Sequence, residues 1–333
     1  MRKHKVGIIG LGVGEQHLIG YRDVAGVEVA ALCDFDPKKL EEVGDRHGIA
    51  ERYTDWRKIT EHEDIDIVSV CSYDNYHADQ CLSAFRHGKH VLVEKPVVLH
   101  RHEAEALLKA QQDSGKLITS NLILRQSPRF RMVKQQVESG AFGDVFCIEG
   151  GYIHQILWKI TDGWRGKMPF YSTLFGGGIH LIDLMRWILG QEITEVCGMG
   201  NKVLTRNTAY KFDDTFLHLL RFEGGAIGRC LSTLGPARTK FHELTVYGSK
   251  RTFVNDLPFG KAFSGDRPED ESVVETPYPG MEKGDLIPDF IDAIDTGREP
   301  NVTAKDVFRV MDICFAAMDS VEQRKTVSVS YMI

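Results

Sequence analysis

KVGIIGLGVGEQHLIGY, residues 5–21, decides the fold class of this chain. The apolar run at residues 6–9 predicts a buried strand, the glycines after it predict a tight turn, and residues 16–21 predict a helix. Glycine is needed where the backbone turns sharply and where a pyrophosphate approaches the N-terminus of a helix. The pattern predicts a nucleotide-binding turn. Its expected cofactor contacts are Gly10, Gly12, Val13 and Gly14.

The glycine spacing is imperfect, because the usual third glycine would fall on Glu15, whereas Gly14 lies one residue earlier. The context supports the nucleotide-binding interpretation. Residues 27–36 predict a second apolar strand that ends at Asp34, 24 residues after Gly10. An acidic residue at about this distance binds the hydroxyl groups of the adenosine ribose. The alternative is that Asp34 is an ordinary loop residue.

The identity of Asp34 also bears on the choice of cofactor. A carboxylate at this position would repel a 2′-phosphate, which favours NAD over NADP. Lys38 and Lys39 lie nearby in the sequence and keep NADP possible.

Strand and helix patterns alternate from residue 5 to residue 121. Asp36 and Pro37 fit the N-cap and the first position of a helix, and Gly88 fits a helix C-terminus. Further strands are predicted at 65–72, 90–94 and 116–121, and helices at 37–48, 77–88 and 102–115. The alternation predicts a doubly wound parallel sheet, a Rossmann domain, over residues 1–121. Ligands of such sheets lie outside the carboxyl ends of the strands.

The composition excludes several classes of protein. The chain has 333 residues, a hydrophobic content of 42%, a charged content of 26% and a net charge of −6. These values indicate a globular protein without the basic surface that nucleic acid requires. No apolar run is long enough to span a membrane. The seven cysteines contain no Cys-x-x-Cys pair, which argues against a metal site and favours the reducing cytoplasm.

Residues 122–333 predict a second domain of mixed α and β structure. Residues 216–233 and 241–254 each predict a β-hairpin, with turns near Gly224 and Gly248. Residues 259–285 are acidic and rich in glycine and proline, and predict an exposed excursion. Residues 303–318 predict an amphipathic helix that Thr303 and Asp306 cap.

Five segments carry a family resemblance that covers essentially the whole chain. They are GIIGLGVGEQH (7–17), CDFDP (33–37), YDNYHADQCLSAFRHGKHVLVEKP (73–96), GGGIHLIDLMRWILG (176–190) and GDLIPDFIDAIDTGREPNVTAKDVFRVM (284–311). The chain resembles the glucose–fructose oxidoreductase, inositol dehydrogenase and rhizopine catabolism (GFO/IDH/MocA) family of oxidoreductases.

The resemblance implies both a fold and an activity. The expected fold is an N-terminal Rossmann domain followed by an α+β domain with an open, mostly antiparallel sheet. This sheet is expected to join subunits into a homo-oligomer, a dimer or a tetramer. The expected activity is hydride transfer between NAD(P) and a secondary alcohol or ketone of a sugar, an inositol or a sugar nucleotide.

Two catalytic residues follow from the same resemblance. Lys95 of the Glu-Lys-Pro motif is expected beside the nicotinamide, after a Lys-Pro bond that is often cis, where its ammonium stabilises negative charge on the reacting oxygen. His180 is expected to accept the hydroxyl proton, since the pKa of histidine lies near neutrality. Further cofactor contacts are expected at Ser72, Asn75, His77, Glu94, Lys95 and Pro96.

One departure from the family pattern concerns the catalytic histidine. Many relatives carry an aspartate four residues before it, where this chain has Gly176. Asp183 follows His180 by three residues and would share its helix face. Asp183 then has three possible roles, which are orienting the imidazole, contacting the substrate or supporting the structure.

Other candidates for substrate contact lie near the expected strand ends and in a polar, aromatic segment. They are Asn121, Arg125, Tyr152, His154, Trp164, Arg165 and Tyr171. The alternative for the last three is a surface loop that packs its own aromatic rings.

Two other functions remain compatible with the sequence. The first is a non-catalytic NAD-binding regulator, which the missing aspartate suggests and the retained Lys95 and His180 oppose. The second is an enzyme that keeps NAD bound and cycles it within one reaction, as some glycosidases of the family do.

Overall fold

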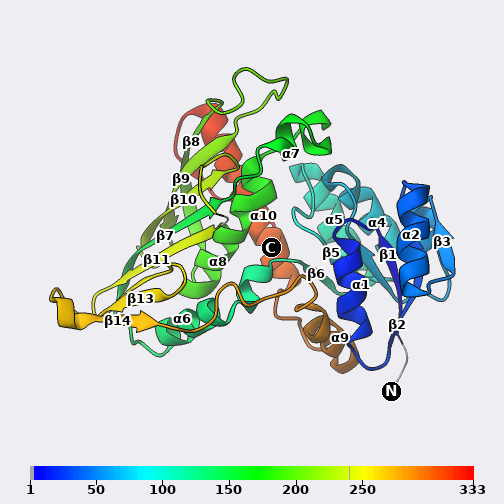
Figure 1. The fold of residues 1–333 in the computed structure, drawn as a ribbon, viewed down its shortest axis with the longest axis horizontal. Helices are drawn as coiled ribbons and strands as arrows, with labels where there is room; N and C mark the ends of the chain where they lie inside the picture. The colour runs from blue at the N-terminus through cyan, green and yellow to red at the C-terminus, as the bar shows by residue number, and fades with distance from the viewer. Residues whose placement is uncertain (1–3, 240) are drawn as a thin grey trace. The chain divides into compact units, whose positions relative to one another are not determined.

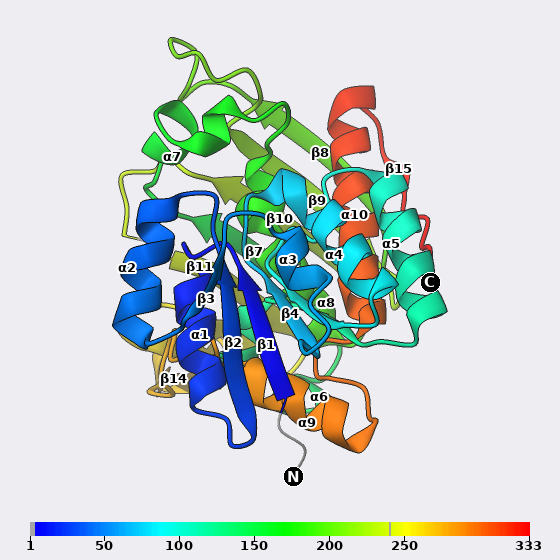
Figure 2. The same ribbon diagram turned by 90° about the vertical axis from the view of Figure 1, so that its right-hand side faces the viewer.

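The computed structural model describes residues 4–239 and 241–333, which form two compact units (Figures 1 and 2). Unit 1 runs up to Ile123 and also takes in Glu282–Met311 and Met332–Ile333. Unit 2 comprises Leu124–Met281 and Asp312–Tyr331. The chain therefore leaves the first unit, builds the second, and returns to the first before it ends.

Unit 1 is built on a parallel sheet of six strands in the order β3-β2-β1-β4-β5-β6. The strands are β1 (His4–Ile9), β2 (Val27–Cys33), β3 (Glu51–Tyr53), β4 (Ile67–Val70), β5 (His90–Val93) and β6 (Ile118–Ser120). The order reverses direction between β1 and β4, and in such sheets this is the point where a dinucleotide binds. The predicted Rossmann fold is confirmed.

Five helices connect these strands: α1 (Gly14–Arg22), α2 (Pro37–His47), α3 (Arg57–Thr60), α4 (His77–Arg86) and α5 (Arg101–Ser114). Asp36 caps α2 as predicted, since its carboxylate accepts hydrogen bonds from the backbone amides of Lys38 and Lys39. The strands β4 and β5 are almost wholly buried, as expected for parallel strands with helices on both faces.

The returning segment completes the core of unit 1. Helix α9 (Ile287–Thr296) contributes Ile287, Phe290 and Ile291 to the apolar cluster that also holds Leu18 and Tyr21 of α1. The next helix, α10 (Ala304–Gln323), begins in unit 1 and continues into unit 2. Thr303 and Asp306 cap it through reciprocal hydrogen bonds, as predicted.

Unit 2 contains a sheet of nine strands in the order β14-β13-β12-β11-β7-β10-β9-β8-β15. Its strands are β7 (Val145–Ile153), β8 (Ile193–Asn201), β9 (Thr215–Phe222), β10 (Ile227–Thr233), β11 (Phe241–Gly248), β12 (Thr252–Val254), β13 (Gly260–Phe263), β14 (Glu271–Val274) and β15 (Val327–Ser328). Neighbouring strands are antiparallel except β7 and β10. The predicted open, mostly antiparallel sheet is confirmed, and both hairpins form as predicted.

The helices of unit 2 lie along one face of this sheet (Figure 1). They are α6 (Pro128–Glu138) and α8 (Ile179–Leu189), which pack together, and α8 also packs on β7. A π-helical turn at Leu174–Gly178 leads directly into α8. The short helix α7 (Trp158–Thr161) and a 3-10 turn at Trp164–Lys167 precede it in the chain.

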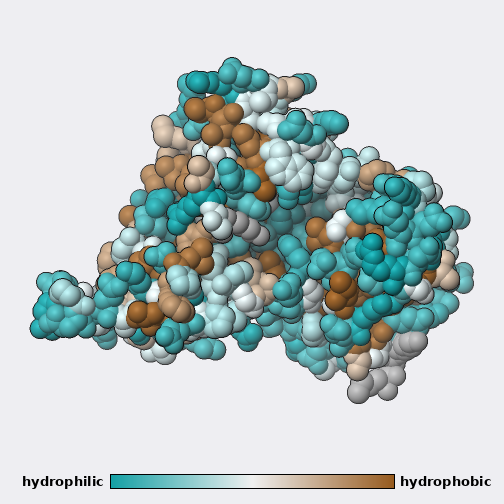
Figure 3. Space-filling view, viewed as in Figure 1, coloured by the Kyte–Doolittle hydropathy of each residue, from teal (hydrophilic) through white to brown (hydrophobic). Residues whose placement is uncertain are grey.

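The other face of the large sheet exposes apolar side chains. In β9, Phe216, Leu220 and Phe222 are buried, whereas the alternating residues Leu217 and Leu219 are exposed. Figure 3 shows brown, apolar atoms at several places on the surface of this unit. An exposed apolar sheet face is typical of an interaction surface.

One expectation about unit 2 is incomplete. Residues 259–285 are mostly exposed, as predicted, but they also contain β13 and β14, which extend the large sheet at its edge. Their short length and high glycine and charge content hide the strand pattern. Among the residues that the structure describes, no helix has both the length and the apolar composition needed to cross a lipid bilayer.

Candidate active site

The turn after β1 has the geometry that the first glycine predicts. Gly10 has a φ of 86°, in the region that favours glycine. A Cβ atom at Gly10 would lie 2.6 Å from the carbonyl carbon of Cys71 and from the Cα of Ser72. Only glycine therefore allows β1 to turn this close to the end of β4.

The next two glycines serve different purposes. A Cβ at Gly12 would meet only the Lys39 ammonium, at 3.7 Å, so the backbone above the start of α1 is open to a ligand. A Cβ at Gly14 would lie 2.9 Å from Cγ2 of Ile8, so this glycine lets α1 pack on β1. Gly14 thus allows close helix packing although it lies one residue early. The open backbone and the adjacent ammonium suit a pyrophosphate at the helix N-terminus.

Asp34 lies at the end of β2 and connects it to the glycine turn. Its Oδ2 accepts a 2.7 Å hydrogen bond from the backbone amide of Leu11, and its Oδ1 accepts one of 3.0 Å from Asp36. The sequence did not reveal this bracing role. Each carboxylate oxygen retains a second lone pair, so a ribose hydroxyl can still donate to it.

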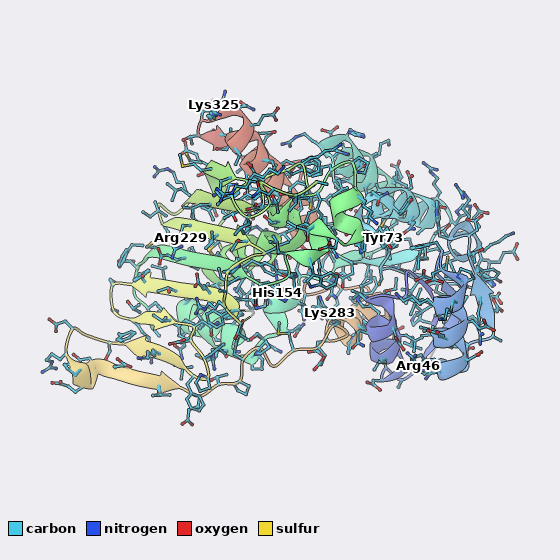
Figure 4. The ribbon with its side chains drawn as sticks, turned by 45° about the horizontal axis from the view of Figure 1, so that its top comes forward. Arg46, Tyr73, His154, Arg229, Lys283 and Lys325 are labelled. Carbon is cyan, nitrogen blue, oxygen red and sulfur yellow. The ribbon has the colours of Figure 1, made fainter. Side chains whose placement is uncertain are left out.

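Two aromatic residues flank this region: Tyr73, in the loop that resembles the family's cofactor loop, and Phe35, which was not predicted. Phe35 follows Asp34 and is 66% exposed, and its ring meets that of Tyr73 edge to face with the centroids 5.3 Å apart. Tyr73 follows β4 (Figure 4). Exposed aromatic rings beside a nucleotide turn offer a stacking surface for an adenine. In the sequence, an aromatic residue shortly after each of two predicted strands would have indicated this surface.

The Glu-Lys-Pro motif follows β5, and its Lys95-Pro96 bond is cis, as the family resemblance implied. The carbonyl oxygen of Pro96 lies 2.7 Å from Nδ1 of His77, and the carbonyl oxygen of Ser72 lies 3.2 Å from Nε2 of the same ring. His77 is fully buried and so connects the loops after β4 and β5. Asn75, by contrast, is exposed.

Glu94 is buried at the centre of a hydrogen-bond network. Its Oε1 lies 3.2 Å from Nε2 of His17 and accepts a 2.7 Å hydrogen bond from Nδ2 of Asn121. The other ring nitrogen of His17 lies 2.9 Å from Oγ of Ser69. Asn121 also donates to the carbonyl oxygen of Lys283, a residue labelled in Figure 4. The network therefore ties together α1, β4, β5 and the segment that returns from unit 2.

The charges in this network are stabilised against burial. Burial alone would raise the pKa of Glu94, but Lys283, His17 and Lys95 hold it well below its usual value. Burial would lower the pKa of His17, but the Cys71 sulfur and the Glu94 carboxylate outweigh it and raise this pKa to about 10. A charged pair thus includes the residue before Lys95, whose ammonium also favours the charged form of Glu94. His17 and Lys283 were not predicted as site residues, although His17 closes the first motif.

His180 in unit 2 is the second residue of α8 and is buried. Its ring centroid lies 6.4 Å from that of Tyr152, with 23° between the two ring planes. Tyr152 also contacts His154, whose Nδ1 lies 3.3 Å from the phenol oxygen, near the end of β7 (Figure 4). The structure therefore brings together three residues that the sequence analysis had selected separately.

A row of polar side chains crosses the buried face of the large sheet at this point. His242 of β11 and Ser232 of β10 are both in register with Tyr152 of β7. The centroid of the His242 ring lies 5.7 Å from that of Tyr152, and its Nδ1 lies 2.7 Å from the hydroxyl of Tyr278. His242 was not predicted, and only the strand register places it here. Burial raises the pKa of Tyr152 to about 12 despite Arg165, so its phenol is neutral near pH 7.

The three consecutive glycines before His180 accommodate this row and its neighbours. The Tyr171 hydroxyl lies where a Cβ of Gly176 would be, the Tyr152 ring lies against Gly177, and the Ser232 hydroxyl lies against Gly178. The glycine run is therefore the surface on which three polar side chains pack.

Arg125 and Asp183 form a buried ion pair. Nε of Arg125 donates to Oδ2 of Asp183 over 2.8 Å, and Nη2 donates to Oδ1 over 2.5 Å. The side chains are 4% and 1% exposed, respectively. Of the three roles left open for Asp183, these contacts support the structural one.

The polar, aromatic segment of unit 2 packs partly on itself. The Arg165 guanidinium lies 4.2 Å from the centroid of the Trp164 ring and 5.8 Å from that of Tyr171. Such stacking is typical of cation–π contacts. Arg165 connects this segment to the phenol that covers Gly176.

Comparisons with known proteins support this description. A family model described as "Oxidoreductase family, NAD-binding Rossmann fold" matches residues 4–122, and one described as "GFO/IDH/MocA C-terminal domain" matches residues 130–254. Myo-inositol 2-dehydrogenase of Thermotoga maritima is 24% identical, with 99% of both chains covered. The 4-carboxy-2-hydroxymuconate-6-semialdehyde dehydrogenase of Sphingobium sp. is 26% identical, with 96% of this chain and 98% of that protein covered.

Among solved structures, levoglucosan dehydrogenase in complex with NADH has the same fold. It superposes with a TM-score of 0.86 at 22% identity and covers 99% of this chain and 100% of that one.

Proposed function

Because the chain belongs to the GFO/IDH/MocA family of oxidoreductases with an NAD-binding Rossmann fold, we propose that it transfers a hydride between NAD and a secondary alcohol or ketone of a sugar-like polyol. The names of the relatives support this substrate class, since inositol and levoglucosan are both cyclic polyols. Sugar nucleotides stay within the proposal.

The observation that carries the proposal is the polar row beneath His180. His242, Tyr152 and Ser232 lie side by side, in register, on the buried face of the large sheet. Burying polar groups costs free energy unless they find hydrogen-bond partners. Hydroxyl-rich substrates supply both donors and acceptors for such a row. The proposed reaction gives these residues a purpose that packing alone does not.

Each step of the proposed oxidation has a residue to perform it. When bound, NAD supplies the hydride acceptor. His180 takes the proton from the substrate hydroxyl as the C–H hydride leaves. Lys95 stabilises negative charge on the reacting oxygen. In the reducing direction His180 returns the proton to the carbonyl oxygen.

We assign the remaining candidates according to their contacts. Asn121, Arg125 and Asp183 are proposed to support the site, since Asn121 binds Glu94 and the other two bind each other. Substrate contacts are proposed for Tyr152, His154, Trp164, Arg165 and Tyr171. Cofactor contacts are proposed for Gly10, Gly12, Val13, Gly14, Asp34, Ser72, Asn75, His77, Glu94, Lys95 and Pro96.

The proposal is tested by NADH absorbance, with purified protein, NAD and a panel of inositols, sugars, sugar acids and sugar nucleotides. His180→Ala should lower kcat by about 10²–10⁴-fold, because the proton acceptor is lost. Lys95→Ala should lower it by about 10²-fold or more, because charge on the reacting oxygen is no longer stabilised. The exposed residues His102 and Lys109 offer matched controls, and their alanine variants should keep wild-type activity.

Three outcomes decide between this reaction and its rivals. Activity that both site variants retain would overturn the catalytic assignment. Cofactor that survives dialysis, with turnover that needs no added NAD, would indicate a closed cycle. NAD binding without turnover of any panel compound would indicate a regulator. NADP in place of NAD in the same assay tests the cofactor preference that Asp34 implies.

We further propose that the chain forms a homo-oligomer, a dimer or tetramer, through the exposed face of the large sheet, and that it functions in the cytoplasm. Leu217 and Leu219 of β9, Met199 of β8 and Ile227 of β10 are exposed on paired strands. An apolar patch on adjacent strands is typical of an interface with a second copy. The seven cysteines are all free, as expected in a reducing compartment.

A further inference from the structure

Tyr171 occupies the place that a side chain at position 176 would otherwise take. A Cβ on Gly176 would lie 2.7 Å from Cζ of Tyr171 and 3.2 Å from its Cε2, and the hydroxyl oxygen would be closer still. Real Cβ atoms essentially never approach another atom within 3.0 Å. Gly176 and Tyr171 are therefore a matched pair, because any larger residue at position 176 would displace the phenol.

The Tyr171 phenol packs on the turn that leads into the helix of His180. Gly176 belongs to the π-helical turn that continues into α8, one turn before His180. Residues one turn apart lie on the same side of a helix. The Tyr152 ring packs against the adjacent Gly177, and its centroid lies 6.4 Å from the centroid of the His180 ring. The Tyr171 hydroxyl and the Tyr152 ring thus pack on adjacent glycines of the turn that leads into the helix of His180.

Two contacts hold Tyr171 in this position. The hydroxyl of Tyr210, a buried residue, donates a 3.1 Å hydrogen bond to the backbone carbonyl of Tyr171. The Arg165 guanidinium lies 5.8 Å from the centroid of the Tyr171 ring. A side chain that is fixed in this way loses little further entropy when it binds a ligand.

We propose that Tyr171 is a substrate-binding residue whose phenol replaces a carboxylate as the hydrogen-bonding group one turn before His180. This inference rests on the proposed function and assigns one residue of its site. The phenol hydroxyl both donates and accepts one hydrogen bond, whereas a carboxylate only accepts. Tyr171 can therefore donate to a substrate oxygen that only accepts, such as a ring oxygen, which a carboxylate could not bind.

The first test removes only the hydroxyl. Tyr171→Phe should lower kcat/KM by about tenfold, which is the effect of one uncharged hydrogen bond. NADH binding, followed by fluorescence, should stay unchanged, because the cofactor contacts lie elsewhere. Tyr53→Phe is the matched control, since the Tyr53 hydroxyl donates a 3.3 Å hydrogen bond to the exposed Glu51. A Tyr171→Phe enzyme within twofold of wild type would overturn the proposal.

The second test separates binding from a structural role. Tyr171→Ala opens the space above Gly176, and Tyr171→Ala with Gly176→Asp places a carboxylate there. The double variant should recover at least about tenfold of the activity that Tyr171→Ala loses, since a hydrogen-bonding group returns to the same place. A purely structural tyrosine would not be rescued by a buried carboxylate. A double variant no more active than Tyr171→Ala, while both remain folded by circular dichroism, would contradict the proposal.

Failure of the wider function can be distinguished from failure of this assignment. If the wild-type protein oxidises no panel compound, the proposed function fails. Tyr171 is then judged by the shift in melting temperature that the same polyols cause in the presence of NADH. A shift in wild type that Tyr171→Phe loses would support the binding role. An equal shift in both proteins, or none in either, would overturn it.

Discussion

Glu94 and His17 show how single residues prepare the end of a strand for chemistry. Both are buried, and each lies close to a partner of opposite charge. A buried carboxylate without such partners would take up a proton. Here Lys283 and His17 keep it charged, and Asn121 adds a hydrogen bond. The charge of Glu94 can then hold the Lys95 segment in place through the whole physiological pH range.

The raised pKa of His17 predicts a specific dependence of stability on pH. The pKa is about 10 in the folded chain and about 6.5 when unfolded. The folded state therefore binds the proton more tightly, and this contribution to stability is complete below pH ~6.5. It should be lost progressively as the pH rises toward about 10. The urea midpoint of the wild-type protein should fall over this interval.

His17→Gln tests this prediction. The variant should be less stable than wild type at pH 6.5, and the difference should shrink toward pH 10, because the titrating group is gone. His102→Gln, at an exposed position, is the control and should follow wild type. Parallel curves for wild type and His17→Gln would show that the charge of His17 does not stabilise the fold. The titrating groups that raise this pKa, Cys71 and Glu94, are common to both proteins.

At the scale of elements, α8 is the helix that positions the chemistry of unit 2. It begins after a π-helical turn that ends in three glycines, which let Tyr152, Tyr171 and Ser232 approach its start. π-helical turns are often found at functional sites. Arg125 anchors the same helix through two of its residues. It forms the ion pair with Asp183, and its guanidinium lies 5.8 Å from the centroid of the Trp187 ring. A helix that is held at both points keeps His180 in one orientation.

The ion pair gives a prediction about stability. Asp183→Ala should lower the free energy of unfolding by about 3–5 kcal/mol, because the buried charge of Arg125 loses its partner. The double variant Arg125→Met with Asp183→Leu should recover most of this loss, because no charge is left buried. Urea denaturation measures both.

A surface pair provides the comparison. Lys109 and Asp113 are exposed and 2.9 Å apart, and Asp113→Ala should cost no more than about 0.5 kcal/mol. A similar small cost for Asp183→Ala would mean that the buried pair contributes little to the fold.

At the scale of the whole molecule, two units of different architecture share one chain. The parallel sheet of unit 1 presents strand ends and loops to a nucleotide, as doubly wound sheets do. The large sheet of unit 2 buries one face, which includes the polar row at Tyr152, and exposes apolar side chains of β9 on the other. The segment Glu282–Met311 belongs to unit 1 although it follows most of unit 2 in sequence, so unit 1 is complete only after most of unit 2 has been traversed.

The exposed sheet face predicts an oligomer that a single charge should disrupt. Leu219 is 56% exposed and lies among the apolar residues of β8 and β9. Leu219→Glu should lower the molar mass measured by light scattering, because a charge buried at an interface is unfavourable. Val273→Glu is the matched control, since Val273 is 61% exposed but lies on β14, four strands away from β7 in the sheet. A monomeric wild type at all concentrations would contradict the oligomer.

Local patterns in the sequence were sufficient for five of the six strands of unit 1 and for its first turn. The Asp36 cap acts through contacts close along the chain, and Gly10 and the apolar runs leave patterns in consecutive residues, so these elements can be predicted without knowing their partners. The short strand β3 and the helix α3 were missed because three- and four-residue elements leave no clear periodicity. The pair β13 and β14 was missed because glycine, proline and charge there are more typical of loops.

By itself, the sequence determined the family, the Rossmann fold, the cofactor class and the identities of Lys95 and His180 as candidates, since these depend on short motifs. Only the tertiary structure decided that Asp183 pairs with Arg125, that His242 lies beside Tyr152 and that Tyr171 covers Gly176. The physical reason is that these contacts depend on strand register and on the packing of a helix against a sheet. A periodic pattern shows which face of an element is buried, but the partner on that face is set by the three-dimensional packing.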